Sequence, residues 1–268
     1  MNMRFHLSII TLFFFFFAIA QPAVTNRKDT IGSTTITYQT TCYGKPDSSV
    51  SFINVHENEN TSVIAAKQVF NAAKKYCVTQ LRCRDMRLIS FIYKGKTFTV
   101  DPNRIYTAKG ALASLKKNSR SYNDDVFAAA LKLVDLLGKN FTDSFINNKS
   151  LVVALHNNTN GEPLSIISYK SGSESQNATD AYINLQQDPD DFFLVTEQSI
   201  FDFLKQKGFN VALQDNVHVT DDGSLSVYAA KNRIPYINIE AQVGHIAEQK
   251  KMLEAVLECI SRRVGTDH

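Results

Sequence analysis

The sequence predicts a single α/β domain in which one sheet is covered by helices on both faces. From Thr34 onward, short runs of β-branched and aromatic residues alternate with amphipathic helical patterns. Strands that alternate with helices in this way are typical of a sheet buried on both sides. The chain has 268 residues, of which 44% are hydrophobic and 21% charged, so it contains enough apolar material for one large domain.

The predicted elements are eight strands and four helices with clear limits. Thr61 and Ser62 are good capping types for the first helix, and Asp124 and Asp125 stand in the first turn of the second, with Gly138 just beyond its end. The strand candidates are residues 34–40, 50–55, 87–93, 150–155, 164–169, 192–196, 225–229 and 234–239. The helix candidates are residues 62–76, 124–137, 197–207 and about 245–263.

The charge balance argues against two classes of partner. The chain has 29 basic and 26 acidic residues, a formal net charge of +3. So small an excess supplies no electrostatic basis for binding nucleic acid or an anionic membrane.

The N-terminus has the three parts of a secretory signal. Arg4 supplies the basic start, residues 7–17 an apolar run, and Ala18-Ile19-Ala20 a small-residue end, which predicts cleavage after Ala20. The apolar run is too short to cross a bilayer, and no later segment is long and apolar enough to do so. We therefore expect a secreted or periplasmic protein without stable membrane insertion, with residues 1–20 removed, a flexible polar segment at 21–31, and one domain over 32–268.

Four cysteines fit an oxidising compartment. Cys42, Cys77, Cys83 and Cys259 form an even set, which predicts disulfides with three connectivities open. A zinc site made of cysteines is not expected, because the sequence has no C-x-x-C pair. Five N-x-S/T sequons do not by themselves establish glycosylation; they begin at Asn60, Asn140, Asn148, Asn157 and Asn177.

Polar and ionisable side chains follow three of the predicted strands where each strand ends. In an open α/β sheet the ligand crevice lies outside the carboxyl ends of the strands, so these side chains converge if the strands are neighbours. A carboxylate in such a place needs a cation, hydrogen-bond donors or a metal, because an unpaired buried charge is costly. The three cases are residues 50–55 followed by His56 and Glu59, residues 150–155 followed by His156, and residues 234–239 followed by Glu240.

These residue types match a catalytic zinc site. His56, Glu59 and His156 form a His₂Glu set, and three protein ligands plus one open position is the usual arrangement of catalytic zinc. Zinc polarises a carbonyl and lowers the pKa of water. Glu240 would then act as general base and pass the proton to the leaving nitrogen.

Further candidates lie near these strand ends. Arg104 with the adjacent Asn103 can clamp a carboxylate, although an ordinary ion pair between Arg104 and Asp101 is the alternative. Asn157, next to His156, is a candidate for substrate binding. His245, five residues after Glu240, is the rival metal ligand or a partner of the ligands.

With these residues in view, the sequence resembles the zinc carboxypeptidase-like superfamily, which includes metallocarboxypeptidases and the succinylglutamate desuccinylase/aspartoacylase branch. The resemblance spans residues 56 to 240. The matching motifs, in the order of the superfamily, are His56-x-x-Glu59, Asp101-x-Asn103-Arg104, Leu155-His156-Asn157-Asn158-Thr159 and Ile239-Glu240.

The resemblance implies a mixed, mostly parallel sheet of about eight strands and one Zn²⁺ held by His56, Glu59 and His156. It also implies Glu240 as the general base, and Asn103 and Arg104 as the clamp for a carboxylate or the scissile carbonyl. The chain departs from the pattern at Glu57, where the deacylase branch usually has Gly. For the extra Arg that precedes the Asn-Arg pair, Lys96 is the stand-in, and no aligned pocket Tyr can be assigned.

Three functions are compatible with these observations. The main expectation is an exported zinc-dependent peptidase of the metallocarboxypeptidase type, cleaving an amide next to a free carboxylate, with bacterial cell-wall peptides as one substrate class. The first alternative is an N-acyl amino acid deacylase of the desuccinylase/aspartoacylase type. The second is a binding protein that keeps the fold without catalysis.

Overall fold

The computed structural model describes residues 21–161 and 163–266. The predicted signal peptide, residues 1–20, lies outside the described residues, so export stays a prediction.

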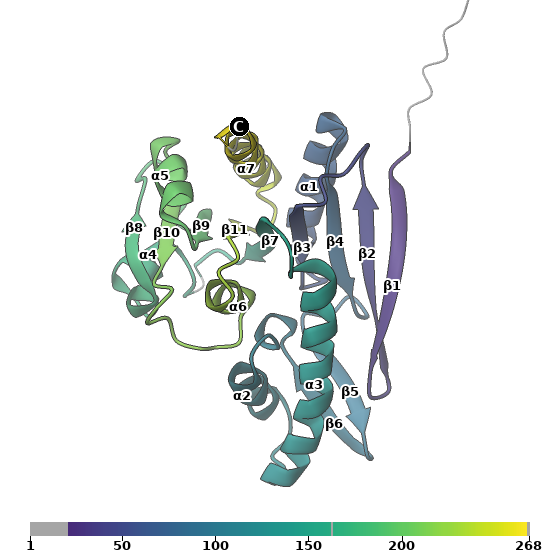
Figure 1. The fold of residues 1–268 in the computed structure, drawn as a ribbon. Helices are drawn as coiled ribbons and strands as arrows, with labels where there is room; N and C mark the ends of the chain where they lie inside the picture. Colours follow the sequence, from purple (N-terminus) through teal and green to yellow (C-terminus); the bar gives the residue numbers. More distant parts are fainter. Residues whose placement is uncertain (1–20, 162, 267–268) are drawn as a thin grey trace, which may run out of the picture.

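Within the described residues, nine strands form one mixed sheet, in the order β1-β2-β4-β3-β7-β11-β9-β10-β8 (Figure 1). The four strands β4, β3, β7 and β11 run parallel at its centre, and antiparallel strands flank them. The sheet strands are β1 (Ala23–Ile31), β2 (Thr34–Cys42), β3 (Val50–Asn54), β4 (Cys77–Arg82), β7 (Leu151–Asn158), β8 (Ala178–Tyr182), β9 (Phe192–Val195), β10 (Asn210–Gln214) and β11 (Tyr236–Gln242). A separate hairpin is formed by β5 (Ile89–Tyr93) and β6 (Lys96–Val100).

Helices cover both faces of the sheet, so the predicted α/β class is confirmed, with nine strands in the sheet rather than eight. Apolar residues of α1, α5 and α7 pack on one face, and those of α2, α3 and α6, together with the hairpin, pack on the other. Helix α4 covers a smaller cluster over β8, β9 and β10. The helices are α1 (Asn60–Ala73), α2 (Ala108–Asn118), α3 (Asp124–Phe145), α4 (Ile166–Ser171), α5 (Gln198–Gln206), α6 (Leu225–Lys231) and α7 (Ile246–Thr266), with two 3₁₀ turns, η1 (Pro102–Arg104) and η2 (Ser175–Asn177).

Helix α3 is longer than predicted, because Gly138 lies inside it instead of ending it. A Cβ atom at Gly138 would stand 2.3 Å from the backbone oxygen of Ile105. The glycine therefore allows the segment after η1 to approach the helix closely, which is a packing requirement and not a stop signal.

Two predicted strands are wrong, since residues 164–169 and 225–229 lie mainly in helices α4 and α6. Each helix begins directly after a serine, Ser165 or Ser224, and Ser165 forms a capping box with Ser168. Short apolar runs do not distinguish a buried strand from a buried helix by periodicity, so both runs were equally compatible with a helix.

The expectation of a flexible segment at residues 21–31 is also wrong. β1 pairs with β2 without interruption from Ala23 opposite Cys42 to Ile31 opposite Thr34. Most β1 residues are exposed because the strand forms an edge of the sheet, and its polar sequence suits an edge.

The four cysteines form one disulfide instead of two. Cys42 and Cys77 are register partners on β2 and β4 and are bonded. Cys83 and Cys259 are free thiols, and both are buried.

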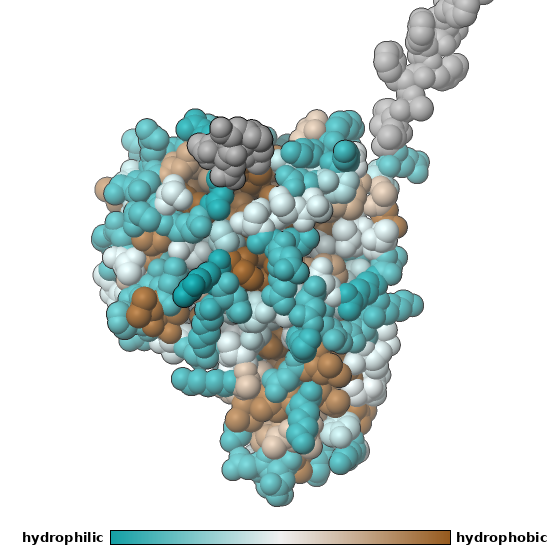
Figure 2. Space-filling view, viewed as in Figure 1, coloured by the Kyte–Doolittle hydropathy of each residue, from teal (hydrophilic) through white to brown (hydrophobic). Residues whose placement is uncertain are grey.

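No helix within the described residues is long and apolar enough to cross a membrane. On the face shown in Figure 2 the surface is mainly hydrophilic, and hydrophobic residues form small separate patches. Scattered apolar residues of this kind are normal for a protein surface.

Candidate metal centre

The strand order brings the three predicted strand ends together. β3 and β11 both pair with β7 in parallel, so the carboxyl ends of all three lie at the same edge of the sheet. Glu240 on β11 is the register partner of His156 on β7. His56 follows two residues after β3, and Glu59 immediately precedes α1. The convergence expected from the sequence is therefore present in the fold.

His56, Glu59 and His156 form a compact buried cluster. Glu59 Oε2 accepts a hydrogen bond from His156 Nδ1 over 2.9 Å, and Glu59 Oε1 lies 2.8 Å from His56 Nδ1. The three side chains offer ligand atoms that all lie within 4.8 Å of one another. Their residues are only 1%, 3% and 3% exposed, so the cluster is screened from water.

The electrostatics of the cluster favour a charged Glu59. Burial disfavours the carboxylate, but the imidazoles of His156 and His56 outweigh burial and hold the pKa of Glu59 well below its ordinary value. Burial likewise favours the neutral ring of His56, yet the Glu59 and Asp101 carboxylates raise its pKa to about 9. The site thus attracts positive charge, in the form of a proton or a metal ion.

The donor set fits a metal ion. His156 Nε2 is buried without a hydrogen-bond partner among the described residues, and His56 Nδ1 faces the Glu59 carboxylate at 2.8 Å. An unsatisfied buried imidazole nitrogen is costly, and a bound cation would remove that cost. Two imidazoles and one carboxylate are the ligand types that zinc accepts. This buried His-Glu-His group can therefore bind a metal.

Asp101 is the partner of His56, which the sequence analysis missed. Asp101 Oδ1 accepts hydrogen bonds from His56 Nε2 and from the backbone N–H of Asn103, both over 2.8 Å. Buried ring hydrogen bonds of this kind fix the orientation of a ligating histidine. Burial raises the pKa of Asp101, but the hydrogen bond to His56 and the charge of its ring hold that pKa below its ordinary value. Its place directly before Pro102 gave no signal of this contact.

Glu240 lies beside the cluster as a buried acid. Asn238 Nδ2 donates a 3.0 Å hydrogen bond to Glu240 Oε1. Burial raises the pKa of Glu240, and the charge of Glu59 raises it further. A raised pKa makes a carboxylate a stronger base, so Glu240 is suited to accept a proton beside a metal site.

Arg87 is a second residue that the sequence analysis missed. Its guanidinium pairs with Glu59 Oε1, and about half of its side chain is exposed. Lys96, the expected stand-in for a cation at this site, instead lies in the hairpin with its ammonium over the ring of Tyr122. That expectation was wrong because the position of the cation depends on the path of the loop before β5, which spacing along the chain does not reveal.

Arg104 and Asn103 lie at the edge of the site and are partly engaged. Arg104 Nε lies 3.3 Å from Asp222 Oδ2, and its Nη1 donates to the backbone oxygen of Asn103. Asn103 Oδ1 accepts from the backbone N–H of Leu225 over 3.1 Å. The alternative pairing of Arg104 with Asp101 is therefore wrong.

A cavity of about 240 Å³ lies next to Asp222, the residue that pairs with Arg104. Asp222 and Tyr169 both line this cavity. Burial raises the pKa of Tyr169, and the charges of Glu174, Glu240 and Asp222 add to the increase. The cavity is thus linked to Arg104 through Asp222.

Asn157 does not face this cavity, which corrects its expected role. Its Oδ1 accepts from the backbone N–H of Ser62, and its Nδ2 donates to the Ala241 oxygen and to Gln249 Oε1. These bonds tie β7 to α1, β11 and α7, so the side chain is structural. The residue is 7% exposed, so its sequon is inaccessible in the folded chain.

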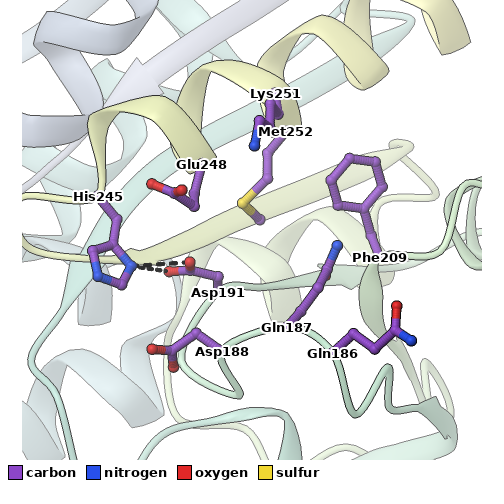
Figure 3. A pocket seen from close by; sticks show the side chains of 9 residues that line it. All are labelled: Gln186, Gln187, Asp188, Asp191, Phe209, His245, Glu248, Lys251 and Met252. Carbon is purple, nitrogen blue, oxygen red and sulfur yellow. Dashed lines mark hydrogen bonds and ion pairs between the residues drawn. The ribbon is translucent and has the colours of Figure 1, made fainter.

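His245 is not part of the cluster. Figure 3 shows its ring paired with Asp191 in a different cavity, with Nδ1 3.0 Å from Asp191 Oδ2. That cavity, of about 400 Å³, is lined by α7 and the segments before β9 and β10. His245 is therefore neither a ligand of the cluster nor a direct partner of its ligands.

Comparisons with known proteins give a likeness in fold alone. No protein-family model matches the chain, and no curated protein matches it. Among solved structures, it is similar to two succinylglutamate desuccinylase/aspartoacylase family proteins, from Shewanella frigidimarina and Shewanella amazonensis. Each has 10% identity to this chain and a TM-score of 0.40. The first match covers 91% of this chain and 72% of the Shewanella frigidimarina protein, and the second covers 90% of this chain and 73% of the Shewanella amazonensis protein. An aspartoacylase family protein from Mesorhizobium loti gives 10% identity, a TM-score of 0.37, and coverage of 89% and 67%.

These neighbours belong to a branch of the superfamily that the sequence resembles.

Proposed function

We propose that the protein is a zinc-dependent hydrolase that cleaves an amide bond next to a free carboxylate. The observation that carries the proposal is the buried group of His56, Glu59 and His156 with Glu240 in register beside it. In this proposal the first three residues hold one Zn²⁺, and Glu240 is the general base.

Each residue has a separate task in the proposed reaction. Bound zinc would polarise the scissile carbonyl and lower the pKa of water. Glu240 takes the proton of the attacking water and passes it to the leaving nitrogen, a task for which its raised pKa is suited. Arg87, whose guanidinium reaches Glu59 from the solvent side, stabilises the negative charge that develops on the carbonyl oxygen.

Arg104 recognises the carboxylate of the substrate. The guanidinium is about one third exposed and has its Nε near Asp222, so part of its donor set remains accessible. A charge-assisted hydrogen bond from Arg104, supported by the amide nitrogen of Asn103, would hold a carboxylate beside the cluster.

A small N-acylated amino acid is the substrate class that fits these surroundings best. The four reacting groups are at most 6% exposed. A cavity of about 240 Å³, lined in part by the Asp222 that pairs with Arg104, is smaller than the usual pocket for a drug-sized ligand, so it suits one side chain or one short acyl group. A peptide with a free C-terminus, the main expectation from the sequence, presents the same bond and carboxylate and is the second candidate.

Export of the protein is part of the proposal. The disulfide between Cys42 and Cys77 fits an oxidising compartment, and the signal features of residues 1–20 point the same way.

Elemental analysis of protein purified without chelators tests the metal, and we expect one zinc per chain. The activity test compares turnover of N-acetyl and N-succinyl amino acids with that of C-terminal dipeptides, with and without a chelator. Chelator-sensitive turnover of the acyl amino acids supports the proposal, and preferential turnover of dipeptides supports the second candidate. Absence of stoichiometric zinc, with no turnover of either class, would indicate the non-catalytic binding protein instead.

A further inference from the structure

Glu57 is a buried carboxylate that the reaction described above does not use. It lies between His56 and Glu59 in the chain and is 3% exposed. Its side chain turns toward the segment between β4 and β5. Glu57 Oε1 accepts from Nε of Arg82, the last residue of β4, over 2.8 Å, and Glu57 Oε2 accepts from the backbone N–H groups of Cys83 and Asp85.

The segment that Glu57 binds has an unusual backbone. Arg84 and Asp85 are consecutive non-glycine residues with φ of 61° and 56°. Left-handed conformations at such residues are unfavourable and persist where the surroundings hold them in place. The bonds from Cys83 and Asp85 to one buried carboxylate flank this strained step, so Glu57 is its anchor.

The same segment delivers Arg87 to the metal centre. Arg87 follows Asp85 by two residues, and its guanidinium pairs with Glu59. The two acids of the turn after β3 thus bind the two ends of the segment, Glu57 at residues 83–85 and Glu59 at Arg87. Because the connection between the two is short, the position of Arg87 depends on the shape that Glu57 imposes.

We propose that Glu57 is a positioning residue that orders residues 83–86 and thereby holds Arg87 against the His56-Glu59-His156 cluster. The task of Arg87 in turnover rests on the proposed function, whereas the ordering of the segment by Glu57 does not. Glu57 occupies the position where the resembled deacylase branch usually has Gly, so this anchor would be a device of this chain.

Cys83 provides a direct measure of the order of this segment. Its free thiol is 5% exposed and lies at the anchored end, whereas the other free thiol, Cys259, is 6% exposed and lies in α7. Labelling with a thiol reagent under native conditions therefore compares Cys83 with an internal reference. Peptide mass analysis distinguishes the two sites.

The experiment compares Glu57→Ala, Glu57→Gln, Arg87→Ala and the double variant Glu57→Ala/Arg87→Ala. Glu57→Ala removes the hydrogen bonds that hold residues 83–85 to a charged group. This loss should raise the labelling rate of Cys83 by about tenfold to a hundredfold and leave the labelling rate of Cys259 unchanged. Glu57→Gln keeps the shape and one acceptor, so its effect should be smaller. Arg87→Ala should leave Cys83 protected, because the anchor is intact.

The second readout is a double-mutant cycle on zinc affinity and kcat. Loss of Arg87 should raise zinc affinity, because its guanidinium repels a cation and competes for Glu59, and should lower kcat by about a hundredfold or more. Glu57→Ala should change both quantities in the same directions. If Glu57 acts through Arg87, the double variant should resemble Arg87→Ala alone.

The positioning role would be overturned if Cys83 stayed protected in both Glu57 variants. It would also be overturned if Glu57→Ala changed zinc affinity and kcat equally in the presence and in the absence of Arg87. General unfolding of a Glu57 variant would label Cys259 as well as Cys83. If both Glu57→Ala and Glu57→Gln unfolded in this way, the positioning role would also be contradicted. Selective labelling of Cys83 in Glu57→Ala, together with a double variant whose zinc affinity equals that of Arg87→Ala, would support the positioning role; in a parent protein that hydrolyses no amide, the same results would reject the proposed function alone.

Discussion

His56 Nε2 and Asp101 Oδ1 lie 2.8 Å apart, although 45 residues separate them in the chain. The bond joins the turn after β3 to the turn before η1. It leaves the other ring nitrogen of His56 facing Glu59. The orientation of one predicted metal ligand is therefore set by a residue outside the ligand set.

Asp101→Asn should weaken zinc binding by about tenfold to a hundredfold, because a partner that orients a ligand and raises its basicity is lost. Competition with a chromogenic chelator measures the affinity. Asp222→Asn is the matched control, since Asp222 pairs with Arg104 and not with a ligand. Equal zinc affinities of Asp101→Asn and the parent would show that the bond does not support the metal.

His156→Ala should abolish stoichiometric zinc, because it removes one of three ligands. His245→Ala should retain one zinc per chain, since its ring pairs with Asp191 in a separate cavity. Elemental analysis after gel filtration measures both. If His156→Ala kept the metal and His245→Ala lost it, the assignment of the two histidines would be reversed.

Glu240→Gln should retain zinc and lose at least about a hundredfold in kcat, the usual effect of removing a positioned base. Glu248→Gln, which changes an acid in the cavity of His245, should leave kcat unchanged. Steady-state kinetics on the best acyl amino acid give the comparison. A kcat within a few-fold of the parent in Glu240→Gln would exclude this residue as the base.

Arg104→Ala should raise KM for a carboxylate substrate by about tenfold or more, through loss of a charge-assisted hydrogen bond, with a smaller effect on kcat. The control is the same substrate with its carboxylate converted to an amide, for which parent and variant should have similar KM. An equal increase in KM for both substrates would mean that Arg104 does not recognise the carboxylate.

Zinc affinity should increase with pH up to about 9, the pKa to which Glu59 and Asp101 raise His56 against the effect of burial. Below that pH zinc must displace a proton from His56, so affinity should rise about tenfold per pH unit between pH 7 and 9. Above it the ring is already neutral and this dependence should end. Titrations at several pH values measure the slope, and a flat profile would contradict the assignment.

The metal-free protein should show the opposite trend in stability. The pKa of His56 is raised in the folded state, so its contribution is complete below the unfolded value of 6.5 and is lost as pH rises through about 9. Urea unfolding of the chelated parent should therefore give a decreasing free energy of unfolding across this window. His56→Gln should remove that part of the decrease.

The class of the fold and the residues at the strand ends could be predicted because both depend on local patterns. Apolar runs that end in His56, His156 and Glu240 indicate where buried strands reach an edge of the sheet. The predicted elements were wrong where the local sequence pattern fits more than one structure. The runs at 164–169 and 225–229 suit either a strand or a helix, and the polar β1 segment gives no apolar alternation because it lies at an edge.

The sequence by itself determined the α/β class and the residue types that gather at one edge of the sheet, because hydrophobic periodicity and the polarity of strand ends are properties of neighbouring residues. Only the tertiary structure decided that Asp101 contacts His56, that Arg87 reaches Glu59, and that Asn157 faces the helices. These contacts depend on strand order and loop path, which arise from hydrogen bonds and packing between segments far apart in the chain.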